Sequence, residues 1–440
     1  MISFDEYERK KQNLCAQSGE AKNLRLGKTT SNLFRHRVDA HDHVIDVRDF
    51  NNVIAIDPVA LVADVEGMTT YETLFDETAR LGLMPAVVPE FKTITVGGAT
   101  TGIGLEASSF RYGFVHETVE EIEVLLPDGQ TIVCSKTKNS DLFYGFPNSY
   151  GTLGYALRLR IKLLPIRPYV KVNHRRYNDF ETYFKEMTRV CAEPLDFIDG
   201  TIFSADEMYI TTGTLVDTAP YQSDYTYMNI YYKSIRRNKE DYMTTRDFIW
   251  RWDTDWYWGS RYFGAEYSIV RFLLGKDRLR SSYYWKLRSQ LNKTPFWNLL
   301  SHVAEYETVV QDVDIPIDEA AEFMDFQFQH VGIRPVWVCP VNALNKQIRY
   351  PFYPLAPSTT YVNLGLWGIV QTTHEPGYYN RLLEAKVTEL QGRKILYSDS
   401  FYSRDEFREL YGGDTYALLK DKYDPQHAFK TLYEKCVTKM

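Results

Sequence analysis

A stretch rich in glycine and hydroxyl groups between residues 89 and 109 carries the residue types needed to bind an anion. It reads PEFKTITVGGATTGIGLEASS and places four glycines within the eight positions 97–104. Glycine lets backbone N–H groups approach an anion closely, and Thr and Ser hydroxyls add further donors. The pattern suits a pyrophosphate, and the alternative is a glycine-rich turn between two strands.

Two shorter segments are rich in the same donors and could serve the same ligand. The first, GKTTSN at residues 27–32, is not a Walker A motif, because Lys22 stands where that motif requires a glycine and no strand is predicted before it. The second covers residues 139–154, where NSDLF is followed by YGTLG and then by a predicted strand.

A dinucleotide fingerprint is also present, but its surroundings argue against a Rossmann site. The spacing Gly102-x-Gly104-x-x-Ala107 matches the fingerprint, which needs a strand before it and a helix after it. The residues that follow, SSFRYGFV, form a poor helix interrupted by Gly113.

Several short strands must position these loops in the first part of the chain. Alternating apolar residues on both sides of Asp128-Gly129 predict a hairpin of residues 121–126 and 130–134, because Asp and Gly tolerate the tight turn. Helical spacing predicts a helix over 71–81, with Gly82 after its end. Strands are expected at 43–47, 53–57, 61–65, 83–88 and 155–164.

Pro165 and Pro168 end this pattern, so we expect a domain boundary near residue 166. Beyond it, strands are predicted at 169–175, 207–213, 334–338 and 360–367, and helices at 180–191, 316–330 and 378–390. This mixture indicates an α+β domain over 166–400. Helices at 404–411 and 415–422 form a last unit, 401–440, expected to return to the first domain, 1–165.

The composition excludes several classes of protein. The 440 residues are 44% apolar and 25% charged, as in soluble globular proteins, and the net charge of −7 makes a general nucleic-acid binder a poor expectation. Five widely spaced cysteines without a C-x-x-C pair argue against a disulfide framework and a thiolate metal site. The N-terminus has no apolar leader segment, so the expected location is cytoplasmic.

Aromatic residues, 15% of the chain, are its one unusual feature, and they are concentrated. Segment 225–300 holds 20 of them, including six of the eight Trp, and residues 233–293 hold 14 Lys and Arg against 7 Asp and Glu. Aromatic and basic residues together suit a bilayer interface or the mouth of a lipid tunnel. The alternative is an aromatic core with Arg stems packed on the rings.

The order of these motifs resembles the PCMH-type FAD-binding domain of the vanillyl-alcohol-oxidase superfamily, and especially its delta(24)-sterol reductase and methylene-fatty-acyl reductase branch. Further resemblance lies in VVQD at 309–312, PVWVCP at 335–340, LYSD at 396–399 and RDEF at 404–407. The likeness covers most of the chain from residue 44 onward, with a shortened first subdomain. It implies a two-subdomain FAD-binding domain with an α+β cap for the substrate.

The resemblance implies which residues hold the FAD. They are Ser31, Asn32, Glu90, Thr95, Val96, Gly97, Gly98, Thr101, Gly102, Gly104, Glu106, Ser108, Ser109, Gly113, Asp141, Gly151, Thr152 and Gly154. Covalent flavin attachment needs a His or Cys, and residues 27–32 contain neither, so we expect non-covalent FAD and no metal.

The resemblance also implies a reaction, the reduction of a carbon–carbon double bond in a lipid with NADPH as electron donor. An isolated alkene needs a proton donor, and the candidates from the matching motifs are Tyr397, Asp399, Tyr402 and Glu106. An alcohol or sugar oxidase or dehydrogenase, and an ether-lipid synthase, are alternatives on the same fold. Two further possibilities stay open: peripheral contact with the inner face of a membrane, and assembly into a homo-oligomer.

Overall fold

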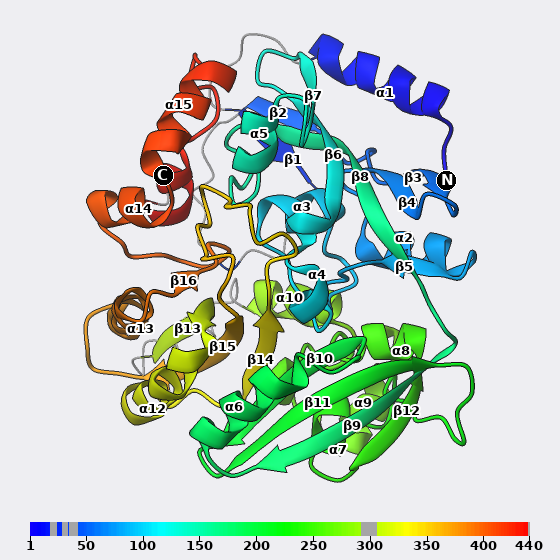
Figure 1. Cartoon of the computed structure of the whole chain (residues 1–440), viewed down its shortest axis with the longest axis vertical. Helices are drawn as coiled ribbons and strands as arrows, with labels where there is room; N and C mark the ends of the chain where they lie inside the picture. Colours follow the sequence, from blue (N-terminus) through cyan, green and yellow to red (C-terminus); the bar gives the residue numbers. More distant parts are fainter. Residues whose placement is uncertain (18–23, 29–33, 35–42, 292–305, 439–440) are drawn as a thin grey trace.

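The computed structural model describes residues 1–17, 24–28, 34, 43–291 and 306–438. The chain builds two main β-sheets, each formed by antiparallel pairs, with helices packed around them (Figure 1). A smaller parallel pair, β1 (Leu24–Gly27) and β2 (His43–Asp46), shares a buried cluster with the first main sheet through Leu24, Ile45 and Leu157. Antiparallel sheets with separate helices confirm the expected α+β class.

The first main sheet has the order β3–β4–β8–β6–β7, and β5 pairs with β8 beside it. The predicted hairpin is confirmed, because Leu125 lies opposite Thr131 and Gly129 between them has φ +85°. The strands are β3 (Val53–Asp57), β4 (Val62–Glu66), β5 (Leu83–Pro85), β6 (Val119–Leu125), β7 (Thr131–Ser135) and β8 (Tyr155–Pro165).

Five helices accompany this sheet: α1 (Phe4–Gln17), α2 (Tyr71–Ala79), α3 (Val96–Thr101), α4 (Ser109–Tyr112) and α5 (Ser140–Gly145). The predicted helix at 71–81 is present as α2, and Thr70 caps its start by accepting a hydrogen bond from Thr73 N. Helix α1 was not predicted. It buries only Tyr7 and Leu14, and two apolar contacts seven residues apart leave little periodicity to detect.

The second main sheet has the order β12–β9–β11–β10–β14–β15–β13–β16. Its strands are β9 (Tyr169–Tyr177), β10 (Phe197–Ser204), β11 (Glu207–Val216), β12 (Glu240–Thr244), β13 (Tyr306–Pro316), β14 (Val336–Val341), β15 (Tyr361–Gln371) and β16 (Arg393–Lys394). Three helices pack on one face of this sheet, α6 (Phe180–Val190), α12 (Ala320–His330) and α13 (Tyr378–Glu389). Figure 1 shows them along the lower edge of the molecule.

The two faces of the second sheet differ in chemistry because side chains alternate along each strand. On β13, Val309, Val313 and Ile315 belong to the cluster shared with the helices, whereas the alternate residues Asp312 and Asp314 lie on the other face. Further alternate residues, Asp199, Trp337 and Trp367, belong to three other strands. The face opposite α6, α12 and α13 is therefore lined by acidic and aromatic groups.

The helices and loops of residues 225–291 cover that second face. They include α7 (Tyr231–Ser234) before β12, then α8 (Thr245–Ile249), α9 (Ser268–Leu274) and α10 (Ser281–Leu291). Residues of this segment also reach the first sheet's helix α2, where Phe75 meets Trp250 at 6.0 Å between ring centroids and Glu72 meets Arg280 at 2.9 Å. The segment therefore joins the two halves of the chain.

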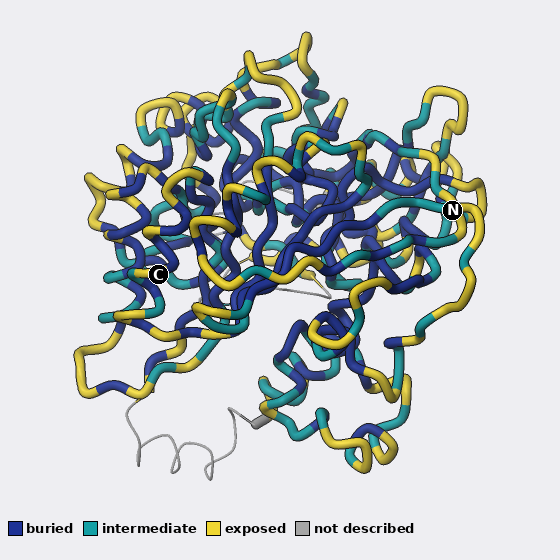
Figure 2. The backbone as a smooth tube through the Cα atoms, turned by 60° about the horizontal axis from the view of Figure 1, so that its bottom comes forward, coloured by how far each residue is buried: buried dark blue, intermediate teal, exposed yellow. Residues whose placement is uncertain are grey.

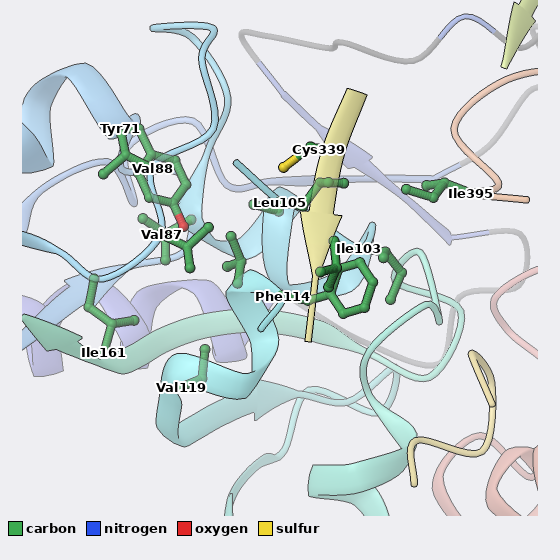
Figure 3. Close-up of a cluster of buried hydrophobic side chains, with 14 of the residues drawn as sticks. Tyr71, Val87, Val88, Ile103, Leu105, Phe114, Val119, Ile161, Cys339 and Ile395 are labelled. Atoms are coloured by element: carbon green, nitrogen blue, oxygen red, sulfur yellow. The ribbon is translucent and has the colours of Figure 1, made fainter. Parts of the chain in front are cut away.

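The last helices, α14 (Arg404–Leu410) and α15 (Gly413–Tyr423), return to the loops of the first half. Lys420 Nζ donates to Thr152 O at 2.8 Å, and Lys422 pairs with Asp141 at 2.6 Å. The core beneath these contacts is continuous: Figure 2 shows buried backbone through the centre, and Figure 3 shows Cys339 of β14 beside Leu105 of the first half. Within the described parts of the chain, no helix has the length and apolar character to cross a membrane.

Candidate active site

The Thr95–Gly98 sequence opens a helix, where a loop was expected. Thr95 accepts a hydrogen bond from Gly98 N at 3.2 Å and thereby caps α3. Gly97 packs on Gly67 so closely that a Cβ atom would lie 2.8 Å from the Gly67 carbonyl oxygen. Because helix α3 stands where a Rossmann fold has a strand, the structure agrees with the argument against that fold.

The glycines in this stretch divide into two groups. A Cβ on Gly104 would lie 2.9 Å from Ala99, so this glycine, like Gly97, permits close packing within the chain. Gly98 and Gly102 are partly exposed, as is Thr101. These exposed positions are where the chain can meet a ligand, whereas Val96, Gly97 and Ser109 are buried.

Most of the predicted donors form hydrogen bonds within the protein and so stabilise their own loops. Thr101 donates to Gly97 O at 2.9 Å, Thr152 to Ser149 O at 2.8 Å and Ser108 to Ala86 O at 2.8 Å. Ser109 accepts from Glu106 N at 3.0 Å, and Asp141 pairs with Lys422 and accepts from Tyr423. Positive φ values mark Gly113, Gly151 and Gly154. Ser31 and Asn32 lie outside the described residues.

Three charged side chains form a buried cluster between the two halves. Arg251 Nη2 lies 3.0 Å from Glu106 Oε1 and 2.7 Å from Asp199 Oδ2, and all three side chains are almost fully inaccessible. The indole nitrogens of Trp252 and Trp337 donate to the same Asp199 oxygen at 3.2 and 3.4 Å. One guanidinium therefore faces two carboxylates.

Glu90 adds a third carboxyl group to this cluster. Burial and the negative charge of Glu106 raise the pKa of Glu90 well above its ordinary value. Its Oε1 atom has no hydrogen-bond partner among the described residues. Burial also raises the pKa of Glu106, although the charge of Arg251 opposes this. Of the three carboxyl groups, Glu106 and Asp199 are the two that pair directly with Arg251 in the described structure.

A second carboxyl group with a raised pKa, Asp312, lies on the second main sheet. Burial, followed by the charge of Asp314, raises the pKa of Asp312 well above its ordinary value, and hydrogen bonds from Trp367 and Tyr397 oppose this only in part. Trp367 Nε1 donates to Tyr397 Oη at 2.9 Å. Asp312 Oδ1 has no partner in the part of the chain that is described. Asp312, Trp367 and Tyr397 are partly accessible, so a ligand can reach them.

The strand register places Asp312 near the aromatic rings of Trp337 and Trp367. Gly365 is the residue paired with Asp312 on one side and with Trp337 on the other. A Cβ on Gly365 would lie 2.5 Å from the Trp367 ring, so the missing side chain lets that indole lie over the strand. Glycine at this position therefore shapes the surroundings of the acid.

Tyr257 connects the two acids. Its hydroxyl hydrogen-bonds to Glu90, and the charges of Glu90, Glu106 and Asp312 all act on its pKa, which burial raises first of all. Its ring lies 4.3 Å from that of Trp367 and 5.6 Å from that of Trp337, measured between centroids. Glu90, Tyr257 and Asp312 thus lie along one buried path lined with aromatic rings.

The predicted proton donors occupy different places. Glu106 lies in the charge cluster and Tyr397 lies beside Asp312. Asp399 follows them in the chain, and its carbonyl oxygen accepts from Lys394 Nζ. Tyr402 is buried 6.0 Å from the Tyr411 ring, in the cluster beside α14. The structure thus places only Glu106 and Tyr397 in contact with Glu90 and Asp312.

Sequence reasoning missed Arg251, Asp199 and Asp312. Asp312 stands within the VVQD segment, so its motif was noted but its raised pKa was not anticipated. Arg251 and Glu106 are 145 positions apart and come together only through the tertiary fold. In the aromatic segment, Trp250, Trp252, Tyr257 and Trp258 are buried, as the alternative of an aromatic core requires. Within the described residues, no group of side chains is arranged to hold a metal ion.

Comparison with known proteins identifies the first half of the chain. Residues 14–135 match the family described as FAD binding domain. The chain is 27% identical to the delta(24)-sterol reductase of Homo sapiens, over 94% of this chain and 79% of that protein. It is 24% identical to the delta(24)-sterol reductase of Pisum sativum, over 89% of this chain and 76% of that protein. Cytokinin dehydrogenase 3 of Arabidopsis thaliana is 31% identical over 34% of this chain and 29% of its own length.

The described residues fit the FAD that this domain implies. Partly exposed glycines and Thr101 offer a surface without bulky side chains, and the unpartnered Glu90 Oε1 offers a polar group beside it in the chain. The chain therefore carries a PCMH-type FAD-binding domain and is an FAD-linked oxidoreductase related in sequence to the delta(24)-sterol reductases.

Proposed function

We propose that this protein reduces a carbon–carbon double bond in a lipid, with NADPH as the electron source. The lipid is either a delta(24)-sterol-like molecule or a methylene-branched fatty acyl chain. The observation that carries the proposal is the carboxyl group of Asp312, whose pKa burial raises well above its ordinary value and which lies among Trp and Tyr rings on the sheet face opposite α6, α12 and α13. The names of the curated relatives, delta(24)-sterol reductases, support the same reaction class.

FAD, when bound, supplies the hydride for this chemistry. Gly98, Thr101 and Gly102 would hold FAD, because these positions are partly exposed in the predicted cofactor loop. Non-covalent attachment is part of the proposal. Denaturing the protein in acid should release all of the yellow colour into the supernatant, whereas covalent flavin would stay with the pellet.

Asp312 is the proposed proton donor. An isolated alkene accepts hydride only when a proton adds to its other carbon, so the site needs an acid that keeps its proton at neutral pH. Asp312 gives this proton and becomes a carboxylate, which then regains a proton from solvent through Tyr397. Tyr397 and Trp367 hold the acid in place through their hydrogen bonds to it.

The aromatic rings have a separate role in the proposal. Adding a proton to an alkene produces positive charge on carbon, and the face of a Trp or Tyr ring stabilises a nearby cation by about 0.5–2 kcal/mol. Trp367, Tyr257 and Trp337 form such a wall, with centroids 4.3–6.3 Å apart. They also exclude water, which would otherwise capture the cation.

The buried charge cluster positions this wall. Glu90 holds the Tyr257 hydroxyl, and Arg251 holds Glu106 and Asp199. Asp199 in turn accepts hydrogen bonds from Trp252 and Trp337. Glu90 and Arg251 are therefore proposed as positioning residues rather than as proton donors to the substrate.

Anaerobic mixing of the purified protein with NADPH, and then with lipid, tests the proposal. NADPH should bleach the flavin absorbance, and either a delta(24)-sterol or a methylene-branched phospholipid should restore it. Absence of bleaching by NADPH and NADH would reject the reductase.

The alternatives predict a different partner for the flavin. An alcohol or sugar oxidase would have its flavin bleached by the alcohol and restored by oxygen, and an ether-lipid synthase would show no net redox change. The match to cytokinin dehydrogenase covers 34% of the chain, so it supports the shared FAD-binding part and does not favour these reactions.

A further inference from the structure

Helix α9 presents an apolar face that the other described residues leave uncovered. Ile269, Phe272 and Leu273 are 70%, 69% and 72% exposed, and Tyr267, just before the helix, is 71% exposed. Ile269, Phe272 and Leu273 follow helical spacing and so share one side of the helix. Large apolar side chains this exposed and this close together mark an interaction site more often than a bare surface.

The opposite side of α9 is firmly anchored. Arg271 is fully buried, lies 2.5 Å from Asp255 and donates to Tyr227 O at 2.6 Å. Tyr227 Oη also donates to Phe272 O at 3.4 Å. The helix therefore cannot simply turn to hide its apolar residues.

Basic residues lie at the edge of this face. Lys276 and Arg278 follow the helix, are exposed and form no ion pair among the described residues. Asp277 lies between them, Asp224 also interacts with Lys276, and Glu266 is paired with Lys233 at 3.3 Å. The segment 233–293 carries a charge of +7 in a chain of −7.

We propose that Tyr267, Ile269, Phe272 and Leu273 insert into the surface of a bilayer that contains anionic lipids, with Lys276 and Arg278 contacting the headgroups. An apolar face with a basic edge is the arrangement that binds at such an interface. A two-fold contact with a second copy would bring two sets of the same basic residues together, so charge favours the bilayer. In Figure 1, α9 lies at the end of the molecule opposite α1 and α15.

This inference deepens the proposed function, because a protein that docks on a membrane can take a lipid substrate directly from it. It also narrows the expected membrane contact within segment 225–300. Most of the rings at 250–258 are buried, whereas the exposed apolar residues lie at 267–273.

Co-sedimentation of the holoenzyme with vesicles tests the proposal. The protein should bind phosphatidylcholine vesicles that contain phosphatidylglycerol, and added salt should weaken this binding. The double variant F272D/L273D should lower the partition coefficient at least about tenfold, because two large apolar contacts are lost. Lys276→Glu with Arg278→Glu should remove the salt dependence.

Leu418→Asp on α15 provides the matched control, since Leu418 is also 72% exposed and lies at the other end of the molecule. This variant should bind vesicles as the wild type does. The proposal would be overturned if F272D/L273D bound the vesicles as well as the wild type does. It would also be overturned if the wild type formed a concentration-dependent dimer and this variant did not. Bleaching by NADPH without lipid reports on the reductase alone, so failure of docking and failure of the proposed function are separable.

Discussion

Arg251 and Glu106 are joined by an ion pair of 3.0 Å, although 145 positions separate them in the sequence. Both side chains are almost completely buried at the place where the aromatic segment meets the glycine-rich stretch. The pair therefore ties the predicted substrate side of the molecule to the predicted cofactor side. Its partner Asp199 extends the connection to the second sheet.

Replacing Arg251 by Met should strongly destabilise the fold. Glu106 and Asp199 would keep their buried negative charges without a counter-charge, and breaking such a pair costs about 3–5 kcal/mol. Urea unfolding at neutral pH, followed by tryptophan fluorescence, measures the loss. The double variant R251M/E106Q should recover part of it.

Arg80→Gln is the control for this experiment. Arg80 pairs with Glu77 at 2.7 Å on the surface, and its side chain is 70% exposed. Such pairs are worth about 0–1 kcal/mol, so this variant should unfold nearly as the wild type does. A similar small loss for Arg251→Met would contradict the role given to the buried pair.

Gly365→Ala should disturb the surroundings of Asp312. The added Cβ would lie 2.5 Å from the Trp367 ring and force the indole away, at a cost of about 1–3 kcal/mol. The bond from Trp367 to Tyr397 should break, and near-UV circular dichroism should change. Lipid-dependent reoxidation should slow at least about tenfold.

Gly368→Ala on the same strand is the comparison. Its Cβ would meet Ile333 at 3.2 Å, where a small shift of a flexible side chain makes room. This variant should keep the wild-type spectrum and rate. If Gly365→Ala behaves in the same way, the packing of Trp367 does not control the site.

The pH dependence of stability should include a contribution from Glu117. Burial raises the pKa of Glu117 to about 7 from its ordinary value of 4.5, while hydrogen bonds from the Phe114 and Leu344 amides oppose the shift. Between these two values the folded chain binds more protons than the unfolded chain. The free energy of unfolding should therefore fall as pH rises from about 4.5 to 7, by at most about 1.4 kcal/mol per pH unit.

Glu117→Gln isolates this contribution, because its side chain stays neutral over the whole range. Urea unfolding at several pH values should show a flatter profile between about 4.5 and 7 for this variant than for the wild type. Parallel profiles for the two proteins would show that Glu117 titrates alike in the folded and unfolded states.

The sequence predicted what local patterns control. Alternation and Asp128-Gly129 identified the hairpin, and periodic apolar residues identified α2, α6 and α13. Helix α3 escaped prediction because its sequence, VGGATT, consists of poor helix formers. It forms because Thr95 caps it and Gly97 lets it pack on Gly67.

The candidate site was predictable only in part, for a physical reason. The cofactor loop is a continuous sequence, so its motif can be recognised. The FAD contacts inferred from that motif stay predictions. Burial and neighbours that are distant in sequence shift the pKa values of Asp312, Arg251 and Glu90. A lone Asp in a strand gives no sign of its raised pKa until the strand register places it beside Trp367 and Tyr397.

The most direct test is the rate at which lipid reoxidises the NADPH-reduced Asp312→Asn variant in an anaerobic stopped-flow experiment. Bleaching by NADPH should stay normal, whereas reoxidation by the delta(24)-sterol or methylene-branched phospholipid should slow by about 10²–10⁴-fold. The wild-type rate should fall as pH rises through the raised pKa of Asp312, and the exposed control Asp318→Asn should match the wild type. Reoxidation of Asp312→Asn at the wild-type rate would contradict the proposed role of Asp312.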